Sequence, residues 1–124
     1  MEKQWDVVFH DEFARDFESW SETVQDAVLS VLGKLRVFGP SLGRPSVDTL
    51  KGSSYPNMKE LRLDAEDGAW RIAFAFDPRR RAILLVGGDK SGVSRDRFYS
   101  GLIRIADARY AKHLKSIVQG GNKK

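Results

Sequence analysis

Three consecutive stretches decide the fold of this chain: residues 57–63 read NMKELRL, residues 70–81 read WRIAFAFDPRRR, and residues 82–90 read AILLVGGDK. The first alternates apolar and polar side chains, and the second alternates large apolar side chains with Arg71, Ala73 and Ala75. Such two-residue alternation is typical of strands that bury one face. The third begins with a run that is apolar on both faces, as in a central strand. Turn-forming residues separate the stretches, so we expect three neighbouring antiparallel strands.

Helical patterns flank these strands on both sides. A short strand is expected at 5–9, and residues 11–20 and 22–38 then carry apolar side chains at helical spacing. Residues 40–57 have the glycine, proline and serine content of a loop. A last helix is expected from Arg95 to about Val118. The predicted order is strand, helix, helix, strand, strand, strand, helix, which is an α+β fold.

One domain over residues 1–118 and a flexible tail over 119–124 are expected. The two-helix hairpin should cover the face of the sheet that carries the larger side chains, Trp70, Ile72, Phe74 and Phe76. On the opposite face, Arg71 lies beside Ala73 and Ala75. We therefore expect that face to be shallow and partly open.

The composition limits the classes of protein and site. A hydrophobic fraction of 41% supports a packed core, while the absence of cysteine and the presence of only two histidines argue against disulfides and zinc. No apolar run approaches the ~20 residues that span a bilayer, and the polar N-terminus does not resemble a signal peptide. We expect a cytoplasmic protein with no membrane segment, metal or cofactor.

The net charge of +4 is unevenly distributed. Residues 1–42 contain four Lys/Arg and eight Asp/Glu, whereas residues 98–124 contain six and one. This asymmetry is consistent with a surface that faces a polyanion, and equally with a solvated, slightly basic protein.

Cationic residues occur inside and directly after the strand patterns. Arg62 and Arg71 lie in adjacent strands, and Lys90 follows the third strand. Arginines beside small residues can hold phosphate through paired N–H donors. RNA is the sensible substrate for such a surface, because its 2′-hydroxyl is an internal nucleophile and cleavage then needs no metal. In the alternative interpretation the arginines are paired surface groups, Arg62 with Glu60 or Asp64 and Arg71 with another carboxylate.

Other residues are weaker candidates. The turn after the second strand supplies three cations that could contact phosphate: Arg79, Arg80 and Arg81. No general base stands out, since Asp89, Lys90 and Tyr99 all have ordinary pKa values poorly matched to neutral pH. Arg109, on the last helix, is expected to be dispensable.

Several short motifs, taken in order, resemble one toxin family: LKG at 50–52, KELR at 59–62, WR at 70–71, FAFDP at 74–78, GGDK at 87–90 and AD at 106–107. The family is the HigB-like, phage-derived branch of the RelE/ParE superfamily of bacterial type II toxin–antitoxin modules. The resemblance covers roughly Trp5 to Leu114. It implies a RelE/ParE-like fold, a small twisted antiparallel sheet with helices packed on one face.

The resemblance also implies an activity and partners. The expected activity is that of a ribosome-dependent mRNA endoribonuclease that inhibits translation, with a helix-turn-helix antitoxin, the ribosome and mRNA as partners. Carried over by position, the catalytic residues would be Arg62, Arg71, Lys90 and Tyr99, and Lys51 would bind RNA. Lys90 or Arg62 would orient the 2′-hydroxyl and stabilise the phosphorane, and Arg71 would hold the scissile phosphate.

Two other functions remain open. The ParE branch has the same fold but inhibits DNA gyrase without cutting RNA, and a non-catalytic nucleic-acid-binding module is also possible. A gyrase-binding protein does not need cations on an open sheet face, so Arg62, Arg71 and Lys90 favour the ribonuclease.

Overall fold

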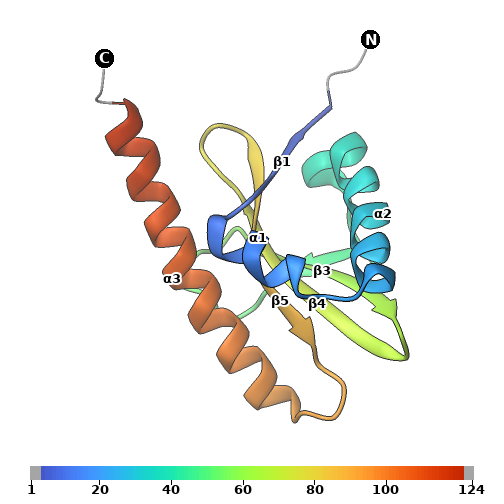
Figure 1. Ribbon diagram of the computed structural model, residues 1–124. Helices are drawn as coiled ribbons and strands as arrows, with labels where there is room; N and C mark the ends of the chain where they lie inside the picture. The colour runs from blue at the N-terminus through green and yellow to red at the C-terminus, as the bar shows by residue number, and fades with distance from the viewer. Residues whose placement is uncertain (1–3, 122–124) are drawn as a thin grey trace.

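The computed structural model describes residues 4–121, which form a five-stranded sheet between helices (Figure 1). The elements, in chain order, are β1 (Asp6–Phe9), α1 (Asp11–Glu18), α2 (Glu22–Phe38), a short 3₁₀ helix (Gly39–Ser41), β2 (Val47–Thr49), β3 (Met58–Ala65), β4 (Gly68–Phe76), β5 (Arg81–Asp89) and α3 (Arg95–Gly121). The predicted α+β class and the order of the long elements are confirmed.

The strands are arranged in the order β1-β5-β4-β3-β2. Neighbours from β2 to β5 pair antiparallel, whereas β1 pairs in parallel with β5. β2 lies within residues 40–57, which were wrongly expected to be only a loop. Its three residues are too few for an alternating pattern to appear, and its pairing with β3 is what makes it a strand.

α1 and α2 cover one face of the sheet, as predicted. Ile72 and Phe74 are fully buried there against Leu32 and Leu35 of α2 and Phe13 of α1. Trp70 and Phe76 are partly buried and pack against the same cluster.

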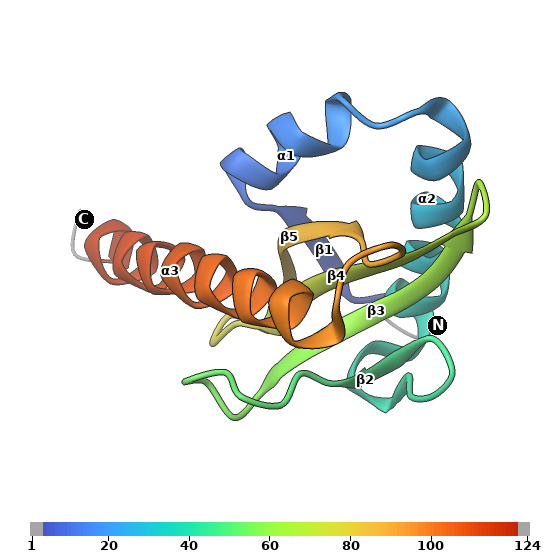
Figure 2. The ribbon, with the colours of Figure 1, turned by 90° about the horizontal axis from the view of Figure 1, so that it is seen from below.

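The opposite face is not open, because α3 lies across it (Figures 1 and 2). Ala73 and Ala75 are fully buried there and belong to one core cluster with Leu102, Ala106 and Tyr110 of α3. The expectation of a shallow exposed face was therefore wrong. The small alanine side chains make room for a helix, and the apolar stripe of α3 needs such a surface to be buried.

α3 continues three residues past the helix end expected at 118. Of the tail expected at 119–124, residues 119–121 are therefore helical, and residues 122–124 lie outside the described range. No helix in the described part of the chain is long and apolar enough to cross a membrane.

Candidate active site

One corner of the sheet face under α3 gathers the charged residues of the candidate site. Arg62 of β3 lies directly opposite Arg71 of β4, and Arg71 is in turn opposite Gly88 of β5. Lys90 follows the end of β5, where its backbone N–H donates a 2.9 Å hydrogen bond to Ala69 O. The structure thus brings three of the four predicted catalytic residues to one corner.

Tyr99, the fourth, reaches this corner from the start of α3. Its hydroxyl donates a 2.8 Å hydrogen bond to Glu60 Oε1, and Arg71 Nε lies 3.9 Å from the same oxygen. The side chains of Glu60 and Arg71 are only 9% and 7% exposed. A buried carboxylate, a buried guanidinium and a phenol therefore lie side by side at the centre of the site.

Arg71 has a hydrogen-bond donor that is not used. Its Nη1 donates to Trp70 O at 2.9 Å, but its buried Nε has no acceptor within hydrogen-bond range among residues 4–121. A buried donor without an acceptor typically costs about 1–3 kcal/mol, so buried donors are nearly always paired. The orphan Nε is the feature here that most directly points to a bound acceptor, such as a phosphate or carbonyl oxygen.

The alternative interpretation, that each arginine is a paired surface group, holds in part. Arg71 does pair with a carboxylate, Glu60, although it is buried rather than at the surface. Arg62 lies 3.8 Å from Asp48 of β2, and forms no ion pair with Glu60 or Asp64. The missed strand β2 supplies the partner of Arg62.

Neighbouring groups at this corner shift the pKa values of Lys90 and Tyr99. Partial burial and the nearby positive charges of Arg71, Arg95 and Arg62 lower the pKa of Lys90, and Glu60 opposes this effect. Burial, followed by the hydrogen bond to Glu60, raises the pKa of Tyr99, so the phenol keeps its proton. Lys90 is thus a better proton donor than an isolated lysine.

A hollow of about 250 Å³ lies over Glu60 and Tyr99, with Lys51 and Arg95 on its rim. The loop that carries Lys51 is tied to α3, because Asp107 accepts hydrogen bonds from Ser53 Oγ at 2.5 Å and Ser54 N at 2.9 Å. The predicted RNA-binding residue Lys51 therefore borders the same site.

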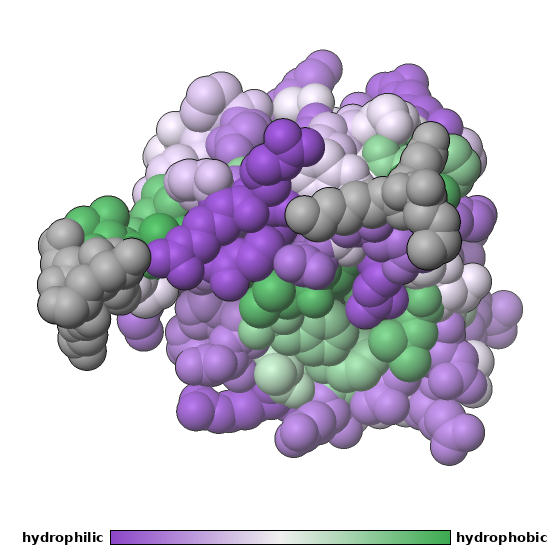
Figure 3. Space-filling view, turned by 90° about the horizontal axis from the view of Figure 1, so that it is seen from above, coloured by the Kyte–Doolittle hydropathy of each residue, from purple (hydrophilic) through white to green (hydrophobic). Residues whose placement is uncertain are grey.

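Arg79, Arg80 and Arg81 lie elsewhere, at the other end of the sheet. β5 runs from Arg81 to Asp89, and eight strand steps correspond to about 26 Å. Arg81 pairs with Asp77 at 2.8 Å, and the Arg80 guanidinium stacks 4.7 Å from the centre of the Trp5 ring. Seen from this end, the surface is largely hydrophilic around an apolar patch (Figure 3). Arg79, Arg80 and Arg81 are therefore not part of the candidate site around Lys90.

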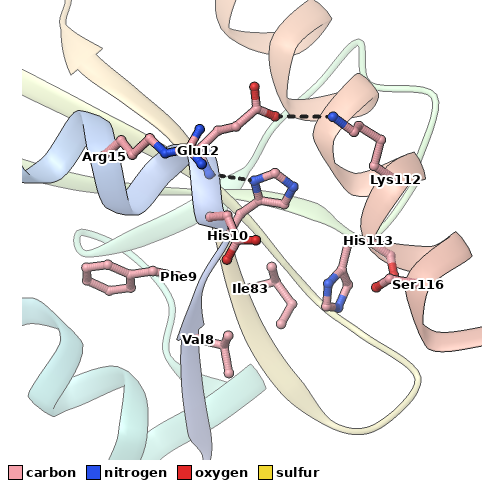
Figure 4. A pocket seen from close by; sticks show the side chains of 10 residues that line it. Val8, Phe9, His10, Glu12, Arg15, Ile83, Lys112, His113 and Ser116 are labelled. Atoms are coloured by element: carbon pink, nitrogen blue, oxygen red, sulfur yellow. Dashed lines mark hydrogen bonds and ion pairs between the residues drawn. The ribbon is translucent and has the colours of Figure 1, made fainter. Parts of the chain in front are cut away.

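A larger cleft, of about 500 Å³, lies between α1 and α3 (Figure 4). It brings together His10 and His113 from opposite ends of the sequence. His10 Nδ1 accepts a hydrogen bond from Glu12 N at 3.2 Å, and His113 Nε2 lies 2.9 Å from the buried carboxylate of Asp77. Because both histidines already serve as structural contacts, the corner with the orphan donor is the stronger candidate.

Two residues of the site were not among the sequence-based candidates. Glu60 was considered only as a surface partner of Arg62, and Arg95 was not considered. Strand alternation does place Glu60 on the same face as Arg62. The signal that was missing is the position of α3, whose first two turns cover Glu60 and bring Arg95 close to Lys90.

Comparison with known proteins gives consistent matches. Residues 15–111 match the family described as phage-derived protein Gp49-like. The chain is 49% identical over 100 residues to the putative toxin HigB3 of Mycobacterium tuberculosis, covering 78% of this chain and 85% of that protein. It is 43% identical over 90 residues to the putative toxin HigB2 of the same organism, covering 72% of this chain but only 44% of HigB2.

A solved structure supports the fold. A mutant of the Escherichia coli toxin RelE in the free state superposes with a TM-score of 0.58, covering 82% of this chain and 96% of RelE. The sequence identity is 13%, so this likeness concerns the fold alone.

Proposed function

The chain belongs to the phage-derived Gp49-like family, as a HigB-like toxin of the RelE superfamily, and from this premise we propose that it is a metal-independent endoribonuclease that cuts mRNA on the ribosome and so inhibits translation. The observation that carries the proposal is the buried pair of Glu60 and Arg71 with the partly buried Tyr99, beside Lys90; Arg71 has a donor that no group of residues 4–121 uses. This group combines a proton acceptor, a proton donor and phosphate ligands.

The chemistry uses the 2′-hydroxyl of the RNA. The 2′-oxygen attacks the adjacent phosphorus, the bond from phosphorus to the 5′-oxygen breaks, and the products are a 2′,3′-cyclic phosphate and a 5′-hydroxyl. One proton must leave the 2′-hydroxyl and one must reach the departing 5′-oxygen. A general acid and a general base together supply these transfers.

Glu60 is the residue best placed to accept the first proton. Its Oε1 accepts the hydrogen bond from Tyr99, while its Oε2 accepts none from the described residues. Tyr99 holds the carboxylate in place, since its raised pKa keeps the phenol protonated. This assignment replaces the sequence-based candidates for the base, Asp89, Lys90 and Tyr99.

Lys90 is the residue best placed to supply the second proton and to neutralise charge on the phosphorane. Its lowered pKa makes it a more effective proton donor near neutral pH. Arg71 Nε would donate to a non-bridging phosphate oxygen, and Arg62 would hold the phosphate from the neighbouring strand. One preorganised donor of this kind is typically worth ~10²–10³ in rate.

The remaining cations would bind the RNA away from the cut. Lys51 and Arg95 border the hollow over Glu60 and would contact the backbone on either side of the scissile phosphate. Arg79 and Arg80 are exposed at the far end of the sheet. They would form a separate contact with RNA, together with the partly exposed Arg81.

The proposed activity also implies an antitoxin partner and a cellular site of action. A toxin of a toxin–antitoxin module is neutralised by a cognate antitoxin, which we propose to be a helix-turn-helix protein. Because the target would be mRNA on the ribosome, the site of action would be the cytoplasm.

The test is a cell-free translation reaction with one defined mRNA, in which primer extension maps cleavage ends with and without ribosomes. Wild type and Lys90→Ala are compared. Cuts that require ribosomes and disappear in Lys90→Ala support the proposal. Intact mRNA in every reaction would rule out the ribonuclease and lead to assays of DNA gyrase inhibition.

A further inference from the structure

Residues 50–57 connect β2 to β3, and a carboxylate of α3 fastens this connection to the helix. Asp107 Oδ1 accepts a hydrogen bond from Ser53 Oγ at 2.5 Å, and its Oδ2 accepts one from Ser54 N at 2.9 Å. Ser53 Oγ in turn accepts a hydrogen bond from Tyr55 N at 3.0 Å. One side chain therefore fixes three consecutive residues of the connection.

Two packing contacts flank Asp107 on the same face of α3. Gly52 has a φ of +100°, and a Cβ at this position would lie 3.3 Å from Ile103 Cδ1, so the backbone passes close over the helix. The ring of Tyr55 meets the ring of Tyr110 edge-on, with centroids 4.9 Å apart. Residues 103, 107 and 110 have the i, i+4, i+7 spacing of one helix face. That face of α3 thus holds the connection.

Lys51 directly precedes the anchored residues and is exposed. It borders the hollow over Glu60 and Tyr99. If the connection were loose, the Lys51 ammonium would be spread over many positions, and RNA that binds it would have to order it at a cost in free energy. An anchored connection removes much of that cost before the RNA arrives.

We propose that Asp107 is a positioning residue for RNA binding, which holds Lys51 where the RNA backbone passes the candidate site. The inference rests on the proposed function, in which Lys51 contacts the backbone beside the scissile phosphate. Asp107 lies eight residues after Tyr99 on α3, a rise of about 12 Å, so it does not reach the reacting groups. Its effect on RNA must pass through the connection that it anchors.

Electrostatics and positioning predict opposite effects when this carboxylate is removed. Asp107→Asn raises the net charge by one, so the general attraction to a polyanion should increase and RNA should bind more tightly. The amide nitrogen cannot accept a hydrogen bond, so the same change weakens the anchor of Ser53 and Ser54. Because Asp107 positions Lys51, the loss of the anchor dominates, and RNA binding weakens by about 3–10-fold, the range for ordering one flexible side chain.

The test is the binding of a short, fluorescein-labelled, single-stranded RNA with 2′-O-methyl groups, which cannot be cut because its nucleophile is blocked. Fluorescence anisotropy gives dissociation constants for wild type, Asp107→Asn, Lys51→Ala and the double variant. Ser53→Ala removes one donor to the carboxylate without changing the charge. The control is Asp26→Asn, the same charge change at an exposed position on α2. Thermal unfolding shows whether each variant is folded.

We expect weaker binding by Asp107→Asn and, to a smaller extent, by Ser53→Ala, whereas Asp26→Asn should bind RNA at least as tightly as wild type. In the Lys51→Ala background, Asp107→Asn should cause no further weakening. The proposal would be overturned if Asp107→Asn bound as tightly as wild type, if the weakening persisted without Lys51, or if wild type bound no RNA. If Asp107→Asn did not fold, Ser53→Ala combined with Lys51→Ala would provide the same comparison.

The binding test and the translation reaction can fail separately. Coupling between Asp107 and Lys51 in RNA binding, with mRNA that stays intact during translation, would overturn the ribonuclease and leave the positioning role standing. Ribosome-dependent cuts without this coupling would support the ribonuclease and overturn the role of Asp107.

Discussion

Tyr99 donates a 2.8 Å hydrogen bond to Glu60, which fastens the start of α3 to the middle of β3. Burial and this contact raise the pKa of Tyr99, so the phenol remains a donor at neutral pH. The hydrogen bond fixes the direction of the carboxylate. Glu60 and Tyr99 therefore act as a base and its orienting group in the proposed reaction.

Glu60→Gln should lower the rate of RNA cleavage by about 10²–10⁴-fold, because the amide cannot take the proton of the 2′-hydroxyl. Tyr99→Phe should have a smaller effect, since it removes the orienting hydrogen bond but leaves the carboxylate. Single-turnover cleavage rates check both changes, and thermal unfolding shows whether the variants are folded. A fully active Glu60→Gln would show that another group takes the proton.

Lys90→Ala should lower cleavage by about 10²–10³-fold and relieve growth arrest with the fold intact, because it removes a cation from the developing phosphorane. The matched control is Lys34→Ala, which removes an exposed lysine on α2. Growth of cells that express each variant and circular dichroism of the purified proteins are the measurements. If Lys90→Ala arrested growth as strongly as wild type, the site would be wrongly assigned.

The sequence predicted the long elements because their patterns are carried by many residues. The alternation in β4 and the helical spacing in α2 each repeat over several positions, and both elements are observed. β2 has only three residues, and its strand character comes from its partner Leu61 and neighbouring residues in β3. A pairing partner distant in sequence leaves no periodic signal in so short a segment.

The site was predicted less completely than the fold. Arg62, Arg71 and Lys90 do lie at one corner, as expected from adjacent strands. The importance of Glu60 depends on how deeply α3 buries it, and strand alternation contains no information about the position of that helix. Arg71 was expected on an open face and is instead 6% exposed as a residue, for the same reason.

Asp77→Asn should destabilise the protein by about 3 kcal/mol near pH 7, as expected when a buried ion pair is broken. Burial alone would raise the pKa of Asp77, but hydrogen bonds from His113 and Arg81 outweigh it and hold the pKa below 3.8. The carboxylate thus contributes stability above its unfolded pKa, and this contribution is lost as the pH falls through the lower folded pKa.

Thermal unfolding of wild type and Asp77→Asn near pH 7 and near pH 2 tests this dependence. The difference in melting temperature between the two proteins should be large at neutral pH and should shrink as the pH falls and wild-type Asp77 takes up its proton. The control is Asp26→Asn, which changes an exposed residue on α2. Its melting temperature should equal that of wild type at both pH values. If the difference in melting temperature were the same at both pH values, the charge on Asp77 would contribute little to stability.

Arg109→Ala should destabilise the fold, contrary to the expectation from the sequence that this residue is dispensable. Arg109 Nη1 donates to Leu85 O at 2.7 Å and to Asp16 Oδ2 at 3.1 Å, and its Nε lies 3.8 Å from Glu12 Oε2. The side chain is only 15% exposed and connects α3, β5 and α1. Because Leu85 O would lose a charged donor, we expect a loss of about 1.5–3 kcal/mol.

Urea unfolding of Arg109→Ala measures this loss, and Arg104→Ala is the matched control. Arg104 is exposed on the same helix and forms no ion pair with residues 4–121, so its removal should change stability by less than about 0.5 kcal/mol. Arg109 lies far along α3 from Tyr99, so the folded fraction of Arg109→Ala should retain its cleavage rate per molecule. Equal stability of the two variants would mean that the contacts of Arg109 are replaced by water at no net cost.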